Sequence, residues 1–338
     1  MISEYIREVT TQLSLPRGRR VGQPGHDIAK QYLLEQLSAL ELVPFRQQPH
    51  LDLTFHRDGQ KFSNLIGVLK GQNPSLPPIL VGAHYDSVID APCSDDNATA
   101  VAVTLAIAKL FQQHQLQRDL VIALFDSEEP PYFHSTSMGS TRFYQDHCQG
   151  FDFATAIIMD LIGHDVELSN KNLQQLFPGL RNLVAVTGCE SQPILPGVVA
   201  AAADASPDLC IVPTLNEYVG DMSDHHIFRL AGVPFLFLSC GQGKFYHTRN
   251  DDLNWINFNK VTATAHFVEK LVLELDHRST SNSHRAQHHD PYEFEIARIE
   301  QALGQGLPLA LQAMDIGPKL RDRPDIDRFI QTLHSQMS

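Results

Sequence analysis

The sequence lacks the features of membrane-embedded, secreted and nucleic-acid-binding proteins. No segment approaches the roughly 18 unbroken apolar residues of a membrane-spanning helix, and residues 1–20 contain acidic residues but no apolar signal-peptide core. Lys and Arg number 26 against 39 Asp and Glu, which gives a net charge of −13. Nucleic-acid binding depends on clustered basic residues, so we expect neither nucleic-acid nor membrane partners. These absences predict a cytoplasmic protein.

Cysteine is scarce as well. The five cysteines are odd in number, widely spaced and without a CxxC pair. This pattern predicts buried, reduced thiols, not a disulfide framework or a cysteine zinc site. Cys93 lies close to the acidic cluster described below, and we interpret it as a packing residue.

The chain is long enough, at 338 residues with 43% hydrophobic residues, to bury a large core. Strand-like apolar runs alternate with segments of helical periodicity, which predicts an α/β fold with three layers, α/β/α, and a central mixed, mostly parallel sheet. The expected helices cover residues 25–40, 97–114, 138–147 and 259–277. The expected strands cover residues 63–71, 77–86, 119–127, 153–163, 182–188, 210–215 and 233–241.

The texture changes after about residue 277. Residues 278–291, "RSTSNSHRAQHHDP", are polar and rich in histidine, and a moderately helical tail follows. No cysteine and no acidic cluster accompany these histidines, so a solvated linker is a better interpretation than a metal-binding tract. We therefore predict a main domain over residues 1–277 and a linker with a small helical C-terminal appendage over residues 278–338.

Polar residues follow the apolar runs with unusual consistency. In an open α/β sheet the carboxyl ends of the strands meet at one rim, where ligands bind. One such residue alone is usually a turn or cap residue, but together they form a histidine and carboxylate set that suits zinc. Carboxylates held this close resist joint ionisation unless a cation lies between them. The set comprises His84, Asp86, Asp95, Asp96, Glu128, Glu129, Asp160 and His247, together with Asp224 and His225, which precede an apolar run.

Six motifs in this set resemble those of a known family. "HYDS", "SDDNA", "DSEE", "MDLIG", "SDHHIF" and "YHTRND" occur in the order found in co-catalytic zinc peptidases, which include bacterial leucyl aminopeptidases, glutamate carboxypeptidase and glutaminyl cyclases. The resemblance covers roughly residues 25–275. It implies the zinc-peptidase (phosphorylase/hydrolase-like) architecture, a catalytic role for residues 1–277 and two zinc ions per chain.

The resemblance also implies a role for each matching residue. His84 and Asp160 would bind one zinc ion, Glu129 and His247 the other, and Asp96 would bridge the two. A two-metal site needs such a bridging carboxylate and holds a water that becomes a nucleophile near neutral pH. Glu128 would be the general base, and Asp86 would orient His84.

The resemblance favours an aminopeptidase that cleaves peptides or aminoacyl compounds with a free α-amino group. Asp95 and Glu128 would offer negative partners to that ammonium. The alternative is a glutaminyl cyclase working with one zinc ion, but cyclases have a tryptophan where this chain has Tyr246, and Trp255 lies eight residues after His247.

A non-catalytic, peptidase-like binding protein is a third reading, although such relatives usually lack ligands or the base. The loop before "SDH" departs from the leucyl aminopeptidase pattern, because it has no cysteine and Tyr218 stands two places early. This departure argues against an oxyanion-binding role for Tyr218. Side-chain specificity and oligomeric state cannot be read from these patterns.

Overall fold

The computed structural model describes residues 1–57, 59–278 and 286–335. Nine strands among them form one sheet in the order β1-β3-β5-β4-β6-β9-β7-β8, with β2 paired to β3. The strands are β1 (Val43–Pro44), β2 (Asp52–Arg57), β3 (Gln60–Leu69), β4 (Ile79–His84), β5 (Leu120–Phe125), β6 (Thr155–Met159), β7 (Leu183–Thr187), β8 (Cys210–Pro213) and β9 (Phe235–Ser239).

The expected mixed α/β sheet is confirmed, and its parallel part lies at the centre. Strands β5, β4, β6 and β9 are parallel neighbours, whereas β3 joins β5 and β7 joins β9 in antiparallel pairs. Every residue of β4, β5, β6 and β9 is buried. Strands covered on both faces read as continuous apolar runs, which explains why the sequence predicted them well.

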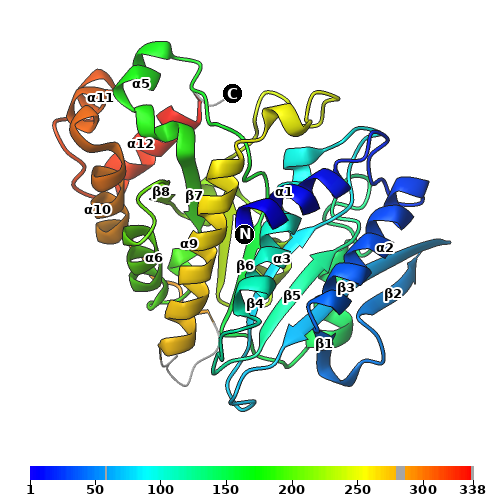
Figure 1. Ribbon diagram of the computed structural model, residues 1–338. Helices are drawn as coiled ribbons and strands as arrows, with labels where there is room; N and C mark the ends of the chain where they lie inside the picture. Colours follow the sequence, from blue (N-terminus) through cyan, green and yellow to red (C-terminus); the bar gives the residue numbers. More distant parts are fainter. Residues whose placement is uncertain (58, 279–285, 336–338) are drawn as a thin grey trace.

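Helices cover both faces of the sheet (Figure 1). Leu236 and Leu238 of β9 face the larger core with α3 and α9, whereas Phe235 and Phe237 face a smaller core with α8. The helices are α1 (Ile2–Leu13), α2 (Pro24–Ala39), α3 (Thr99–Phe111), α4 (Gly139–Phe143), α5 (Lys171–Leu176), α6 (Leu195–Asp204), α7 (Asn216–Val219), α8 (His225–Leu230), α9 (Phe258–His277), α10 (Tyr292–Leu303), α11 (Leu307–Ala313) and α12 (Arg323–His334).

The C-terminal helices lie beside the β7–β8 edge of the sheet (Figure 1). Helix α10 contacts β8, and α12 contacts α10. Ile299, Leu303 and Phe329 of these helices belong to the larger core, and Arg298 forms an ion pair of 2.6 Å with Asp204 at the end of α6. The division at residue 277 stays a prediction. Half of the predicted linker, residues 279–285, lies outside the described residues.

Several elements were not predicted from the sequence. Strand β2 has mostly polar residues because it pairs only with β3 and is largely open to solvent. Helix α6 is a run of small and apolar residues without clear helical periodicity. Within the described ranges, we find no helix with the length and apolarity required to cross a bilayer.

Candidate metal centre

The predicted site residues meet at the carboxyl ends of the central strands. His84 is the last residue of β4, Asp160 follows β6, and Glu128 and Glu129 lie three and four residues after β5. His247 lies in the segment after β9. These strands are parallel, so their ends reach the same rim of the sheet. The fold therefore gathers side chains that are more than 160 residues apart in the chain.

Asp96 occupies the centre of the group, on the turn Ser94–Ala98 before α3. Its Oδ1 lies 3.5 Å from Nε2 of His84, and its Oδ2 lies 3.2 Å from Nε2 of His247. The two oxygens of one carboxylate thus face two different histidines. This is the arrangement that a carboxylate bridging two metal ions requires.

Two groups of potential ligand atoms surround Asp96. His84, Glu128 and Asp160 form one group, and Asp96, Glu129 and His247 form the other, with the atoms of each group within 4.8 Å of one another. Nε2 of His84 lies 3.5 Å from Asp160 but 3.8 Å from Glu128. All three residues of this group can therefore supply a ligand atom, with Glu128 slightly farther from His84 than Asp160 is.

The donor atoms suit a metal ion because several lack any other partner. Buried atoms without a hydrogen bond include Nε2 of His84, Oδ2 of Asp96, Oε1 of Glu129, Oδ1 of Asp160 and Nε2 of His247. An orphaned buried polar atom costs about 1–3 kcal/mol, and several in one place need a common partner. A cation supplies that partner, and mixed imidazole and carboxylate donors are typical zinc ligands.

The pKa values show how costly this cluster is without a cation. Burial raises the pKa of Glu129 to about 8, with a further contribution from the Asp96 charge. Burial also raises the pKa of Asp160, and that of Glu128 well above its ordinary value. At His247 burial disfavours the charged form, but the carboxylates of Asp96 and Glu129, at 3.2 and 3.3 Å from its Nε2, prevail and raise the pKa to about 10. Protons and metal ions therefore compete for the same atoms.

Asp86 and Asp251 hold the ligand loops through their backbone. Asp86 accepts the N–H groups of Glu128 at 3.1 Å and Glu129 at 3.2 Å, and its Oδ1 lies 3.5 Å from Nδ1 of His84. The structure thus places Asp86 where it can orient three site residues, not only His84. Asp251 accepts the N–H of Asp96 at 3.1 Å and fixes the turn that carries it.

Arg19, which the sequence patterns did not indicate, holds the loop that carries Asp96 by binding backbone carbonyl groups. Its fully buried guanidinium donates to five carbonyl groups at 2.6 to 3.3 Å. The five N–H groups of arginine form a rigid fork, so all of them are used here. The accepting carbonyls belong to Leu13, Tyr85, Pro92, Cys93 and Asp96. A single arginine in a separate N-terminal segment gives no sequence signal of this role.

The expected role of Asp95 is corrected. Its carboxylate was expected to offer a negative partner to the substrate ammonium. Instead Oδ1 accepts the N–H of Gly163 at 2.6 Å, and Oδ2 lies 2.5 Å from Nδ1 of His164. Asp95 therefore ties the bridging turn to the segment after β6, and both of its carboxylate oxygens already have partners there.

Three other candidates lie outside the two metal groups. The hydroxyl of Tyr218 binds Asp327 of α12, in keeping with the departure noted in its loop. His225 stacks on Phe237 with 4.1 Å between ring centroids, and burial lowers its pKa to about 3. Asp224 is fully buried, and burial raises its pKa to about 7.

Tyr246 lies beside the site, although the sequence patterns did not indicate a role for it there. Its ring stacks on His247 with 3.7 Å between centroids. Burial raises the pKa of its phenol, and the charges of Asp96, Asp160, Glu129 and Glu128 raise it further. The hydroxyl is therefore neutral over the physiological range and can donate a hydrogen bond beside the cluster.

Comparison with known proteins identifies the class. The model of peptidase family M28 matches residues 64–272, and the chain belongs to this family, which is zinc-dependent. It is 28% identical over 218 residues to the uncharacterized protein YfbL of Escherichia coli, covering 58% of this chain and 66% of that protein. It is 25% identical over 225 residues to aminopeptidase YwaD of Bacillus subtilis, covering 64% of this chain and 45% of that protein. The matches thus span less than two thirds of these relatives.

Solved structures agree on the fold. LapB from Legionella pneumophila superposes with a TM-score of 0.65 at 17% identity, covering 82% of this chain and 72% of that one. The glutaminyl cyclase of Bacteroides thetaiotaomicron superposes with a TM-score of 0.61 at 20% identity, covering 80% and 96%. A glutaminyl cyclase thus shares the architecture of this chain, and the fold alone does not separate peptidase from cyclase activity.

We expect Asp96→Ala to weaken binding at both metal positions, because each oxygen of the carboxylate faces one group. His247→Ala should weaken mainly one position. Competition between zinc and a calibrated chelator measures both affinities. Asp90→Ala, which removes an exposed carboxylate of the same loop, is the control. Loss of a single metal ion from both site variants would contradict the bridging role.

We expect Arg19→Lys to lower the free energy of unfolding by about 3 kcal/mol, because an ammonium cannot satisfy five converging carbonyls. Zinc affinity should also fall, since two of these carbonyls belong to Cys93 and Asp96 on the bridging loop. Urea unfolding of the metal-free protein and zinc titration test the two effects. Arg17→Lys, at an exposed position, should change neither.

Proposed function

We propose that the chain is an aminopeptidase that uses two zinc ions to hydrolyse the N-terminal bond of peptides or aminoacyl compounds. The observation that carries this proposal is Asp96, whose two carboxylate oxygens face His84 and His247 separately. Each oxygen would then serve one of two zinc ions. Under this proposal His84 and Asp160 hold one ion, Glu129 and His247 hold the other, and Asp96 is shared.

The protein's own residues divide the remaining work. Zinc ions bound here would supply Lewis-acid activation of a water and of the scissile carbonyl. Glu128, which this proposal leaves free of metal, accepts the proton of the attacking water and returns it to the leaving amine. Burial raises the pKa of Glu128. The positive charge of zinc ions bound nearby would lower the pKa of Glu128 again, toward the range in which a base works at neutral pH.

Tyr246 supplies a neutral hydrogen-bond donor beside the same atoms. As the substrate carbonyl becomes tetrahedral, its oxygen gains negative charge, and a preorganised donor stabilises that charge more than it stabilises the substrate. The neutral phenol of Tyr246 meets this requirement, whereas the hydroxyl of Tyr218 is held by Asp327. We therefore assign oxyanion stabilisation to Tyr246.

The test combines metal analysis with a substrate panel. The purified protein should contain two zinc ions per chain and cleave aminoacyl 4-nitroanilides. A glutaminyl cyclase should instead contain one zinc ion and convert glutaminyl peptides to their pyroglutamyl forms. A binding protein without catalysis should act on neither substrate. Cyclisation without anilide cleavage would replace the proposed activity.

We expect Glu128→Gln to lower kcat by about 10²- to 10⁴-fold, because it removes the proton carrier and keeps the shape of the side chain. Its zinc content should stay at the wild-type value, since Glu128 is not among the ligands proposed above. Glu129→Gln is the matched comparison and should lose zinc. Loss of zinc from Glu128→Gln would make Glu128 a ligand instead of the base.

Hydrolysis should also require a free α-amino group. The cluster is lined by carboxylates, and an N-terminal amine can interact with them or with a metal ion. Acetylation removes this interaction and adds bulk where the chain end must lie, so kcat/KM should fall by well over tenfold. A comparison of leucyl 4-nitroanilide with its N-acetyl derivative measures the effect. Equal kcat/KM values for the two substrates would indicate a carboxypeptidase or a deacylase with the same metal ligands.

A further inference from the structure

His164 is a buried histidine close to the metal ligands that has no part in the proposed reaction. It lies four residues after Asp160, in the segment that follows β6, and only 2% of it is exposed. A buried imidazole needs polar partners in the protein, because it has lost its hydrogen bonds to water. The neighbours of this ring show which parts of the site it connects.

The imidazole of His164 binds the turn that carries Asp96. Its Nδ1 lies 2.5 Å from Oδ2 of Asp95, and the nitrogen is the donor because a carboxylate oxygen only accepts. Oδ1 of the same carboxylate accepts the N–H of Gly163 at 2.6 Å. Two adjacent residues of the segment after β6 thus bind both oxygens of Asp95. Since Asp95 directly precedes Asp96, these contacts restrict the position of the proposed bridging carboxylate.

The ring of His164 also packs against the segment that carries His247. It stacks on Trp255 with 5.7 Å between ring centroids and 9° between ring planes, and Phe245 contacts Trp255 edge-on at 4.8 Å. Gly243 approaches the imidazole so closely that an added Cβ would lie 3.0 Å from its Cδ2. Gly243 and Phe245 stand four and two residues before His247. The ring therefore supports this segment at two points.

The backbone of His164 is fixed independently of these two contacts. The buried ammonium of Lys260 in α9 donates to the carbonyl of His164 at 2.6 Å and to that of Arg181 at 3.3 Å. Hydrogen bonds from a charged donor are stronger than those between neutral groups. Helix α9 therefore holds His164 in place, and the imidazole can restrain the turn and the segment that it contacts.

We propose that His164 is a positioning residue of the metal centre. Its segment carries Asp160, its Nδ1 fixes the turn of Asp96, and its ring supports the segment of His247. One ligand from each metal position and the shared carboxylate are thereby kept at fixed distances from one another. This inference rests on the two-zinc site proposed above, but not on the reaction that the site catalyses.

Loss of the His164 side chain should lower zinc affinity without abolishing it. Residues that orient metal ligands typically contribute about 10- to 100-fold to metal affinity. His164 acts through neighbours of the ligands, and Asp251 still accepts the N–H groups of Asp95 and Asp96 at 2.8 and 3.1 Å. We therefore expect losses at the lower end of this range, about tenfold.

Two substitutions separate the two contacts of the ring. His164→Asn keeps a side-chain N–H that can reach Asp95 but removes the ring, so it should weaken mainly the zinc position of His247. His164→Phe keeps a ring on Trp255 but removes the donor, so it should weaken both positions, because Asp96 is shared. Competition between zinc and a calibrated chelator measures the two affinities of each variant.

Trp255 is the only tryptophan of the chain, so its fluorescence reports on the stacking contact without any metal. In the metal-free protein, acrylamide should quench this fluorescence more strongly in His164→Asn than in the wild type or in His164→Phe, since only the asparagine variant uncovers the indole. Trp255→Leu removes the same contact from the other side and should reproduce the zinc affinities of His164→Asn. It keeps the inference testable if a His164 variant does not fold.

Val268→Ala is the control for a general loss of stability. Val268 is a fully buried residue of α9 in the larger core, so its truncation should lower the melting temperature and leave both zinc affinities unchanged. If Val268→Ala weakened zinc binding as much as His164→Phe does, the inference would be wrong, because the effect would then come from stability alone. Wild-type zinc affinities in both His164 variants would also overturn it.

Zinc titration and anilide cleavage together separate this inference from the proposed function. If the wild-type protein binds two zinc ions and the variants differ as expected, but no anilide is cleaved, His164 remains a positioning residue and the aminopeptidase function fails. If anilides are cleaved and the His164 variants bind zinc as the wild type does, the inference fails and the function stands. A wild-type protein that binds no zinc would overturn both.

Discussion

The structure depends on the burial of like charges at one rim of the sheet. Asp96, Glu129 and Asp160 lie together with little solvent, and the raised pKa values of Glu129 and Asp160 measure how strongly burial disfavours their ionised forms. A fold does not retain such a cluster for its own stability, because unpaired buried carboxylates are costly. A bound cation would offset the repulsion among these buried carboxylates. The free energy lost in burying them would therefore contribute to the affinity for the metal.

The surrounding framework is built to keep that cluster from relaxing. Arg19 fixes the carbonyls of the bridging loop, Asp251 fixes its N–H groups, and Asp86 fixes the segment that carries the glutamate pair. These contacts come from separate segments and converge on backbone atoms. Held in this way, Asp96 keeps one oxygen toward each histidine. Catalysis by positioned charges requires this kind of preorganisation, because reorganising dipoles during the reaction would cost activation energy.

The sequence predicted which side chains would gather at the rim because strand ends follow buried apolar runs, which are visible in the chain. His84 and Asp160 each stand directly at the end of such a run. The supporting residues carry no comparable signal. Arg19 acts on carbonyl groups, which every residue has, and the carboxylate of Asp95 has the same appearance in sequence as a ligand although it bonds Gly163 and His164. A metal ligand and a supporting carboxylate differ in the direction of the side chain, and tertiary packing decides that direction.

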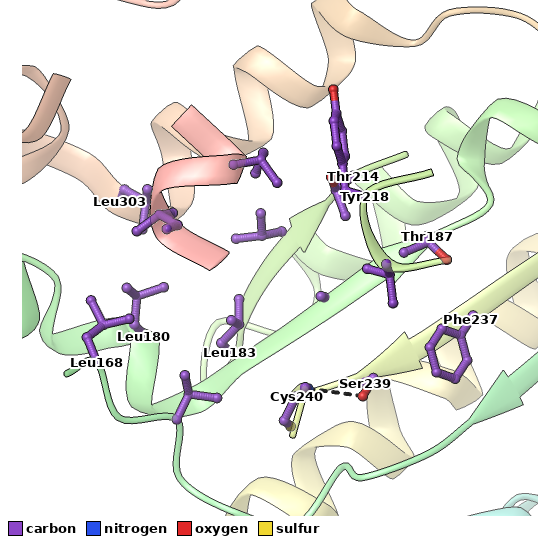
Figure 2. Close-up of a pocket in the computed structure, with 17 residues that line it drawn as sticks. Leu168, Leu180, Leu183, Thr187, Thr214, Tyr218, Phe237, Ser239, Cys240 and Leu303 are labelled. Carbon is purple, nitrogen blue, oxygen red and sulfur yellow. Dashed lines mark hydrogen bonds between the residues drawn. The ribbon is translucent and has the colours of Figure 1, made fainter. Parts of the chain in front are cut away.

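The apolar cavity between the sheet and the C-terminal helices (Figure 2) is another feature that the sequence does not predict. Its walls come from β7, β9, α10 and α12, so no local pattern could reveal it. The central strands fix the metal ligands through parallel register, which leaves little freedom for variation in the chemistry. The wall formed by α12 faces no such constraint, because it touches no ligand and is held by ion pairs of Arg323 at its N-terminal end. The sequence of that wall can therefore change while the cluster of histidines and carboxylates and its supporting contacts stay as they are.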